Sequence, residues 1–218
     1  MTSVEVSKAE SKPWSLPARG LILFEGERTT ARLSHYFLPG LIQEGKKILF
    51  LDGANAVDPR LMKRLGEQRG IGFEQLNREI EIARAFTCFQ LTELIARVPR
   101  FLETFPAQVL MITALPELYF DEDVRDEPAR AAFDQALEHL DELQQGERPL
   151  TAALFSSAES FSPLPARRPF LLRVRALAAE RRKCAADLEG HIQWRLQAPG
   201  DAPDLPRPLR PVERHVTR

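Results

Sequence analysis

At residues 47–53 the sequence reads Lys47-Ile48-Leu49-Phe50-Leu51-Asp52-Gly53. Four successive apolar residues, bounded by a lysine and by an Asp-Gly turn signal, are typical of a strand that is buried on both faces of a sheet. Short runs of this kind recur at residues 21–24, 80–83, 109–112 and 151–155. The sequence therefore predicts a sheet with at least five strands.

Apolar residues at helical spacing separate these runs, at residues 29–43, 89–105 and 131–145. Asp58-Pro59 is typical of the start of a further helix. Pro39-Gly40 should interrupt or end the first helix, and Pro99 should kink or shorten a later one. Strands that alternate with helices predict an α/β fold, with a mostly parallel sheet and helices on both of its faces.

One domain is expected to span residues 19–197, and a helix-like pattern at residues 177–188 and a sixth strand at residues 191–196 would complete it. Residues 1–18 are polar, contain two prolines and are expected to form a flexible leader. Residues 198–218 contain five prolines and are expected to form an irregular C-terminal tail.

The composition excludes several classes of protein. The chain has 218 residues, of which 44% are hydrophobic, so it can bury a core. It contains no run of about 18 apolar residues, and its first residues lack an apolar signal core, so we expect a cytoplasmic protein without a membrane span. Two cysteines that are far apart favour neither a disulfide scaffold nor a zinc site.

The charge is distributed unevenly, although the net charge is only −1. Residues 1–159 contain 18 basic and 25 acidic residues, whereas residues 160–218 contain 12 basic and 6 acidic residues. Such segregation is typical either of an interaction surface or of a basic region that keeps the protein in solution.

Several phrases, in this order and at this spacing, make residues 20–196 similar to the ATPase core of RecA-type recombinases. They are Leu38-Pro39-Gly40, the strand at residues 47–52, and Ala83-Arg84-Ala85-Phe86. The resemblance implies a RecA-like P-loop NTPase fold. It is closest to recombinase paralogues and to the RecA-like accessory proteins of bacterial damage-tolerance operons.

The resemblance also implies where ATP chemistry would lie, and this sequence departs from the family there. The phosphate-binding loop would fall on Gly26, Glu27, Arg28, Thr29 and Thr30, but it has one glycine and no lysine. Glu25 and Glu27 would place negative charge where phosphate would sit. Ala54 stands where the family has its catalytic glutamate, and Thr113 stands for the metal-binding aspartate. Asp52 remains, either as a turn residue or as a ligand. We therefore expect a degenerate nucleotide site with a short turn at Gly26, no catalytic residue, no cofactor and no metal.

A basic segment coincides with the position at which the family faces DNA. Residues 166–186 hold seven basic residues and only one acidic residue. The candidate nucleic-acid or partner contacts in this segment are Arg167, Arg168, Phe170, Arg173, Arg175, Arg181, Arg182 and Lys183. The arginines would bind phosphates and Phe170 would stack on a base. The alternatives are a solvated basic helix face with Phe170 in the core, an edge strand, or a surface for an acidic protein partner.

Three other features are weaker. His35 lies among apolar residues and indicates packing, and Cys88 is expected to be buried and inert. The acidic residues within 121–127 indicate a solvated loop or a docking patch for a basic partner.

Together these observations favour a non-catalytic RecA-like accessory protein of DNA repair or recombination. Its expected partners are DNA, through residues 166–183, a RecA-family or other repair protein, or a second copy of itself. One alternative is an NTPase that uses Arg28 and Thr29 on phosphates and Asp52 on a metal. Another is a RecA-like structural or signalling scaffold that binds no nucleic acid.

Overall fold

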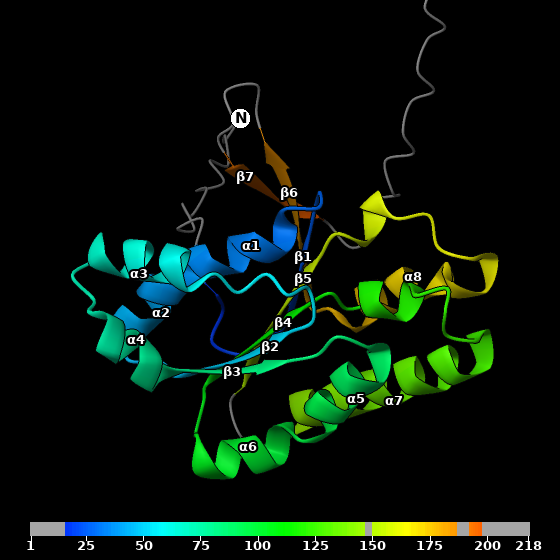
Figure 1. Cartoon of the computed structure of the whole chain (residues 1–218), viewed down its shortest axis with the longest axis horizontal. Helices are drawn as coiled ribbons and strands as arrows, with labels where there is room; N and C mark the ends of the chain where they lie inside the picture. Colours follow the sequence, from blue (N-terminus) through cyan, green and yellow to red (C-terminus); the bar gives the residue numbers. More distant parts are fainter. Residues whose placement is uncertain (1–15, 147–149, 187–191, 198–218) are drawn as a thin grey trace, which may run out of the picture.

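A seven-stranded sheet forms the centre of the protein in the computed structural model, which describes residues 16–146, 150–186 and 192–197 (Figure 1). Its strand order is β3-β2-β4-β5-β1-β6-β7. The first six strands in this order are parallel, and β7 runs antiparallel to β6. The strands are β1 (Gly20–Glu25), β2 (Ile48–Asp52), β3 (Ile80–Arg84), β4 (Val109–Thr113), β5 (Thr151–Ser156), β6 (Glu180–Ala186) and β7 (Ile192–Gln197).

Helices cover both faces of the sheet, as the sequence predicts (Figure 1). One face carries α1 (Thr30–Leu33), the 3-10 helix η1 (Ser34–Phe37), α2 (Leu38–Gln43), α3 (Pro59–Glu67) and α4 (Phe73–Glu79). The other face carries α5 (Cys88–Ala96), α6 (Val98–Thr104), α7 (Asp126–Gln145) and α8 (Pro169–Leu177). Short 3-10 helices lie in the connections, at η2 (Glu117–Phe120), η3 (Ala158–Ser160) and η4 (Pro165–Arg167). The α/β prediction is therefore confirmed.

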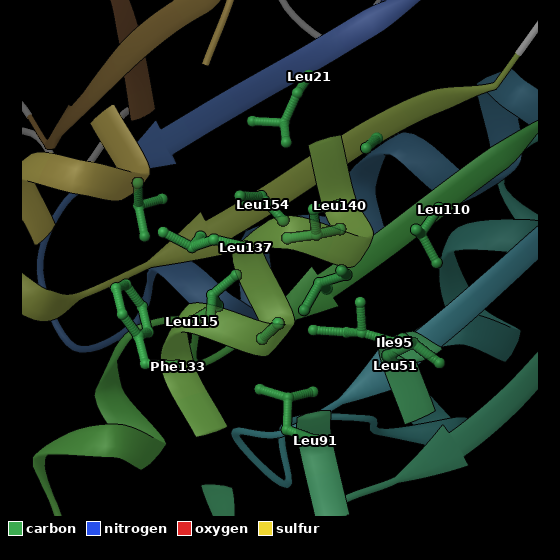
Figure 2. Close-up of a cluster of buried hydrophobic side chains, with 14 of the residues drawn as sticks. Leu21, Leu51, Leu91, Ile95, Leu110, Leu115, Phe133, Leu137, Leu140 and Leu154 are labelled. Atoms are coloured by element: carbon green, nitrogen blue, oxygen red, sulfur yellow. The ribbon is translucent and has the colours of Figure 1, made fainter. Parts of the chain in front are cut away.

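Two hydrophobic clusters lie on the two faces of the sheet, because successive side chains of a strand point to opposite faces. In β1, Leu21 and Leu23 belong to the cluster under α5 and α7, whereas Ile22 and Phe24 belong to the cluster under α2. This double burial explains why the strand sequences read as continuous apolar runs. Figure 2 shows part of the first cluster, with Leu51, Leu110 and Leu154 of the sheet among side chains of α5 and α7.

Local signals in the sequence set several helix ends. The Asp58 side chain accepts hydrogen bonds from the N–H groups of Arg60 and Leu61, so it caps α3, with Pro59 in the first turn. The predicted break near Pro99 occurs at Arg97, between α5 and α6. Near Pro39 the helical segment changes type but does not end. The 3-10 helix η1 ends at Phe37 and α2 begins at Leu38, so Pro39 lies in the first turn of α2.

The structure corrects the sequence prediction at the end of the domain. Within the expected helix at residues 177–188, residues 180–186 form a strand, because β6 pairs with the free edge of β1; residues 187 and 188 lie outside the described residues. The sequence of β6, Glu-Arg-Arg-Lys-Cys-Ala-Ala, lacks an apolar run, so periodicity could not identify it. The basic stretch before it is a helix, α8, and not an edge strand.

The expected leader and tail fall largely on residues 1–15 and 198–218, outside the described residues. The part of the leader that is described is attached to the domain: Leu16 packs against the second cluster, and Thr151 Oγ1 donates to the carbonyl oxygen of Pro17 at 3.0 Å. None of the described helices has the length and apolar character that a membrane crossing requires.

Candidate functional site

A cleft of about 420 Å³ lies where four strands end. The connection after β1 runs to the α1 face, whereas the connection after β5, the neighbour of β1, runs to the α8 face. Open parallel sheets bind ligands at such a reversal, beyond the carboxyl ends of their strands. The residues that line the cleft come from the connections after β1, β2, β4 and β5: Arg28, Ala31, Gly53, Ala54, Ala114, Glu117, Leu118, Ser157 and Phe161.

The turn after β1 contains only four residues, Gly26 to Thr29, and internal hydrogen bonds hold it. The N–H and the Oγ1 hydroxyl of Thr30 both donate to the carbonyl oxygen of Glu27, at 2.9 and 2.6 Å. A Cβ atom on Gly26 would lie 2.6 Å from Thr30 Oγ1 and 3.0 Å from the Cβ of Cys184, so this position requires glycine. The buried hydroxyl of Thr30 is thus used within the turn.

The structure corrects the expectation that Glu25 places its negative charge where a phosphate would sit. That side chain is buried and pairs with Arg175 at 2.7 Å and with Arg181 at 3.2 Å, so its charge is compensated inside the fold. Glu27, Arg28 and Thr29 are exposed. Arg28 is among the residues that line the cleft, and it makes no ion pair with any side chain that the structure describes.

Asp52, at the end of β2, has a structural role. Its side chain is fully buried and accepts hydrogen bonds from the N–H groups of Ala56 and Val57, at 2.9 and 3.0 Å. Arg84 lies 3.4 Å from the same carboxylate. Asp52 therefore shapes the loop after β2 and ties it to the end of β3.

Thr113 and Ala54 meet at the same edge of the sheet. The hydroxyl of Thr113 donates to Asp52 Oδ1 at 3.1 Å and accepts from the N–H of Ala54 at 3.1 Å. Since each oxygen of Asp52 already accepts from a backbone N–H and Thr113 takes a further place on Oδ1, little capacity for a metal ion remains.

Glu117 is the cleft residue that sequence reasoning missed. Its Oε1 accepts hydrogen bonds from the N–H and the hydroxyl of Ser157, whereas its buried Oε2 has no hydrogen-bond partner among the described residues. Burial is the main cause that raises the pKa of this carboxyl above its usual 4.5. A single glutamate within a connecting loop gives no pattern that could have identified it.

His35 is a buried structural histidine, in agreement with the packing that the sequence indicates. Its Nδ1–H donates to the carbonyl oxygen of Arg32 at 2.9 Å, and its Nε2 accepts from the N–H of Asp58 at 3.1 Å. This arrangement requires the neutral ring. Burial, the largest cause, lowers the pKa of His35 below 6.5.

We expect the free energy of unfolding to fall as the pH drops below about 6.5, because the unfolded chain then binds a proton that folded His35 refuses. The loss amounts to at most about 1.4 kcal/mol per pH unit for this single group. Urea unfolding of the wild type and of His35→Gln at pH 7.5 and 5.5 measures it.

Glu117 acts with the opposite sign, since a raised carboxyl pKa makes stability fall as the pH rises above 4.5. The wild type and His35→Gln share this contribution of Glu117. The difference between their pH dependences of unfolding therefore measures the contribution of His35. An equal pH dependence in the wild type and in His35→Gln would show that this histidine is not responsible.

The basic segment requires a correction at Arg167 and Phe170. Arg167 is only 1% exposed; it pairs with Asp126 at 2.8 Å and donates to three backbone carbonyl oxygens of the loop after β4. Phe170 is 2% exposed and stacks on Phe133, with ring centroids 4.2 Å apart. Neither side chain presents a surface to a nucleic acid in this structure.

The other cations of the segment are mostly paired as well. Arg168 is exposed and has no ion pair within the described part of the chain. The remaining pairs are Arg173 with Asp134, Arg175 with Glu25 and Glu159, Arg181 with Glu25, Arg182 with Glu180, and Lys183 with Glu159. With Arg167, six of the seven cations face five carboxylates, so the local excess of positive charge is small.

Two further groups of residues offer no reactive centre. Both cysteines are free; burial raises the pKa of the Cys88 thiol and raises that of Cys184 to about 11, so neither forms a thiolate readily at neutral pH. Within residues 16–146, 150–186 and 192–197, no group of three or more His, Cys, Asp and Glu side chains could hold a metal ion.

Comparison of the sequence with models of known protein families gave no match, and comparison with curated proteins gave none either.

Proposed function

We propose that this chain is a RecA-like domain that has lost ATP hydrolysis and acts by binding a partner protein, in the setting of DNA repair or recombination that the resemblance implies. The observation that carries the proposal is that three positions, which the resemblance assigns to ATP chemistry, lack the residues this chemistry needs. These are the turn after β1, Ala54 and Thr113.

The arrangement of the sheet supports the RecA-like part of the proposal. Asp52 and Thr113 are partners in the register of β2 and β4, and the turn after β1 opens on the same cleft as Ala54. The three positions therefore share one edge of a mostly parallel sheet, which is where P-loop chemistry requires them.

The chemistry at this edge supports the loss of hydrolysis. A triphosphate needs several N–H groups or cations, whereas this turn offers Arg28 next to the exposed carboxylate of Glu27. Phosphoryl transfer also needs Mg²⁺ and a residue that orients water. Alanine at position 54 cannot orient water, and Asp52 is committed to its own loop.

The pairing of the basic segment favours protein over DNA as the partner. Binding to DNA depends on cations that are free to neutralise phosphates. In the basic segment at residues 166–186, five carboxylates already pair with six of the seven cations, and two of those carboxylates, Glu25 and Glu159, each pair with two cations.

Calorimetry with ATP and Mg²⁺ tests the proposal. We expect no binding up to about 1 mM ATP, because the one cation of the turn supplies only a small part of the energy that millimolar affinity requires. Micromolar binding that disappears in Arg28→Ala would overturn the proposal in favour of an atypical NTPase. Tight, salt-dependent binding of a DNA oligonucleotide that is lost when Arg168 and Arg173 are replaced by Ala would instead identify DNA as the partner.

A further inference from the structure

We propose that the cleft at the ends of β1, β2, β4 and β5 binds a small aromatic carboxylate: a planar ring that carries one anionic group. This goes beyond the proposed function, which concerns only what the cleft no longer does. The size of the cleft, the one cation without an ion pair among its described lining residues, its exposed ring and the backbone around it support the inference.

The cleft has the size and lining of a ligand site. Its volume of about 420 Å³ falls within the range that small-molecule sites occupy. Three of the lining residues, Ala31, Ala54 and Ala114, have side chains of a single methyl group, so no large side chain from these positions fills the cleft. A cleft of this size and lining suits one ring better than a string of phosphates.

Arg28 defines the charge of the ligand. It is an exposed guanidinium at the cleft, and it has no ion-pair partner within the described residues. Its planar fork matches the two oxygens of a carboxylate. The other charged groups near it are carboxyls: Glu117 in the lining and Glu27 in the adjacent turn. One cation among two carboxyls fits a single negative charge and disfavours a polyanion.

Phe161 supplies the surface for a ring. It is 44% exposed although it lines the cleft, and its neighbour Phe120, with ring centroids 6.3 Å apart, supports it from one side. Leu118 adds an apolar side chain to the same lining. Aromatic side chains favour offset-stacked or edge-to-face contacts with a second ring, so an aromatic ligand gains more here than an aliphatic one.

The floor of the cleft has features that reduce stability. Ala114 has a φ of +63°, a left-handed conformation that is unfavourable for alanine. Gly53 approaches so closely that a Cβ atom there would lie 2.6 Å from the carbonyl oxygen of Thr113. Glu117 buries a carboxyl oxygen without a partner. Features that lower the stability of the fold in this way are found mostly at sites whose arrangement serves a ligand and not packing.

A ligand with an N–H group near its carboxylate would gain a further contact. The hydroxyl of Ser157 donates to Glu117 Oε1 at 3.1 Å, which leaves the lone pairs of that hydroxyl available to a donor in the cleft. N-acetylphenylalanine combines a ring, one carboxylate and one such N–H, and is therefore the probe of choice.

The test is a titration of the ¹⁵N-labelled full chain, followed through its amide resonances, with three probes. N-acetylphenylalanine should bind with a dissociation constant of about 1 mM, as expected for a ligand of roughly 15 non-hydrogen atoms, and should shift the amides of Gly53, Ala54 and Ala114. N-acetylphenylalaninamide, which lacks the charge, should bind roughly fivefold more weakly. Acetate, which lacks the ring, should cause no such shifts.

Three variants assign the contacts. In Arg28→Gln the acid and the amide should bind equally, because only the charge contact is removed. Phe161→Ala should weaken both probes by roughly tenfold. Arg168→Gln is the matched control: it removes another exposed arginine without an ion pair, outside the cleft lining, and should bind the acid like the wild type.

Equal affinity of the wild type for the acid and the amide would overturn the proposal, as would shifts that map away from the cleft or their absence at about 10 mM. None of these results bears on the proposed function, which is tested by the binding of ATP and of DNA. Conversely, ATP binding would overturn the proposed function but leave the difference between acid and amide to be measured.

Discussion

Replacing Arg167 by Met is expected to lower the free energy of unfolding by about 3 kcal/mol or more. The guanidinium is buried and donates to the carbonyl oxygens of Tyr119, Asp121 and Val124, and to the carboxylate of Asp126. Methionine fills much of the volume but donates nothing, so these carbonyl groups lose their partner away from water. Urea unfolding of the wild type and of Arg167→Met at the same pH measures the change.

Its neighbour provides the control. Arg168→Met removes the same charge from an exposed position and should change the stability by at most about 0.5 kcal/mol. Asp126→Asn should cost about 1 kcal/mol, because that carboxylate is half exposed. If Arg167→Met and Arg168→Met proved equally mild, the buried guanidinium would not be what holds the loop after β4.

Phe170→Ala is expected to cost about 3–5 kcal/mol of the free energy of unfolding. The ring of Phe170 lies between α8 and α7, stacked on Phe133, and its removal leaves a cavity that the rigid sheet on one side cannot close. Thermal or urea unfolding of the variant checks the value.

Leu172 lies two residues further along the same helix but is 59% exposed. Leu172→Ala should therefore change the stability by at most about 0.5 kcal/mol. A Phe170→Ala variant as stable as Leu172→Ala would mean that the ring does not belong to the core, and would restore the possibility that it stacks on a base.

The sequence was sufficient for the parts of the fold that depend on neighbours along the chain. Apolar runs identified β1, β2, β4 and β5, because a strand covered on both faces has no polar positions to interrupt the run. Asp58-Pro59 identified the start of α3, since a cap acts within one turn.

Partners that are distant in the sequence account for what could not be predicted. In the sequence, the run of basic residues after β5 suggests a charged surface, because the carboxylates that pair with these residues cannot be identified there. Two of those carboxylates belong to Glu25 and Asp126, which lie 150 and 41 residues away from Arg175 and Arg167. The same holds for β6: its first four residues are charged, and they form a strand by pairing with residues 22–25 of β1, which are distant in the sequence.

The sequence located the strand ends next to the cleft, but not the contacts that the side chains make there. Strand ends could be located from the sequence, so Arg28, Ala54 and Thr113 were expected at one edge of the sheet. The roles of Asp52 and Glu117 depend on loop conformations, since the first binds the backbone of its own loop and the second binds Ser157, forty residues further on. The turn role of Asp52 was one of the two roles expected from the sequence, whereas no local pattern encodes the contact of Glu117.

The ion pairs of Glu25 have a consequence for how such a protein can change in evolution. A single carboxylate holds Arg175 of α8 and Arg181 of β6 against β1. Losing Glu25 would not by itself create an anion-binding surface, because the side chains of Arg175 and Arg181 are only 11% and 19% exposed. Arg175 would keep Glu159, whereas Arg181 would lose its carboxylate inside the fold. A lineage that loses Glu25 is therefore expected to replace Arg181 as well.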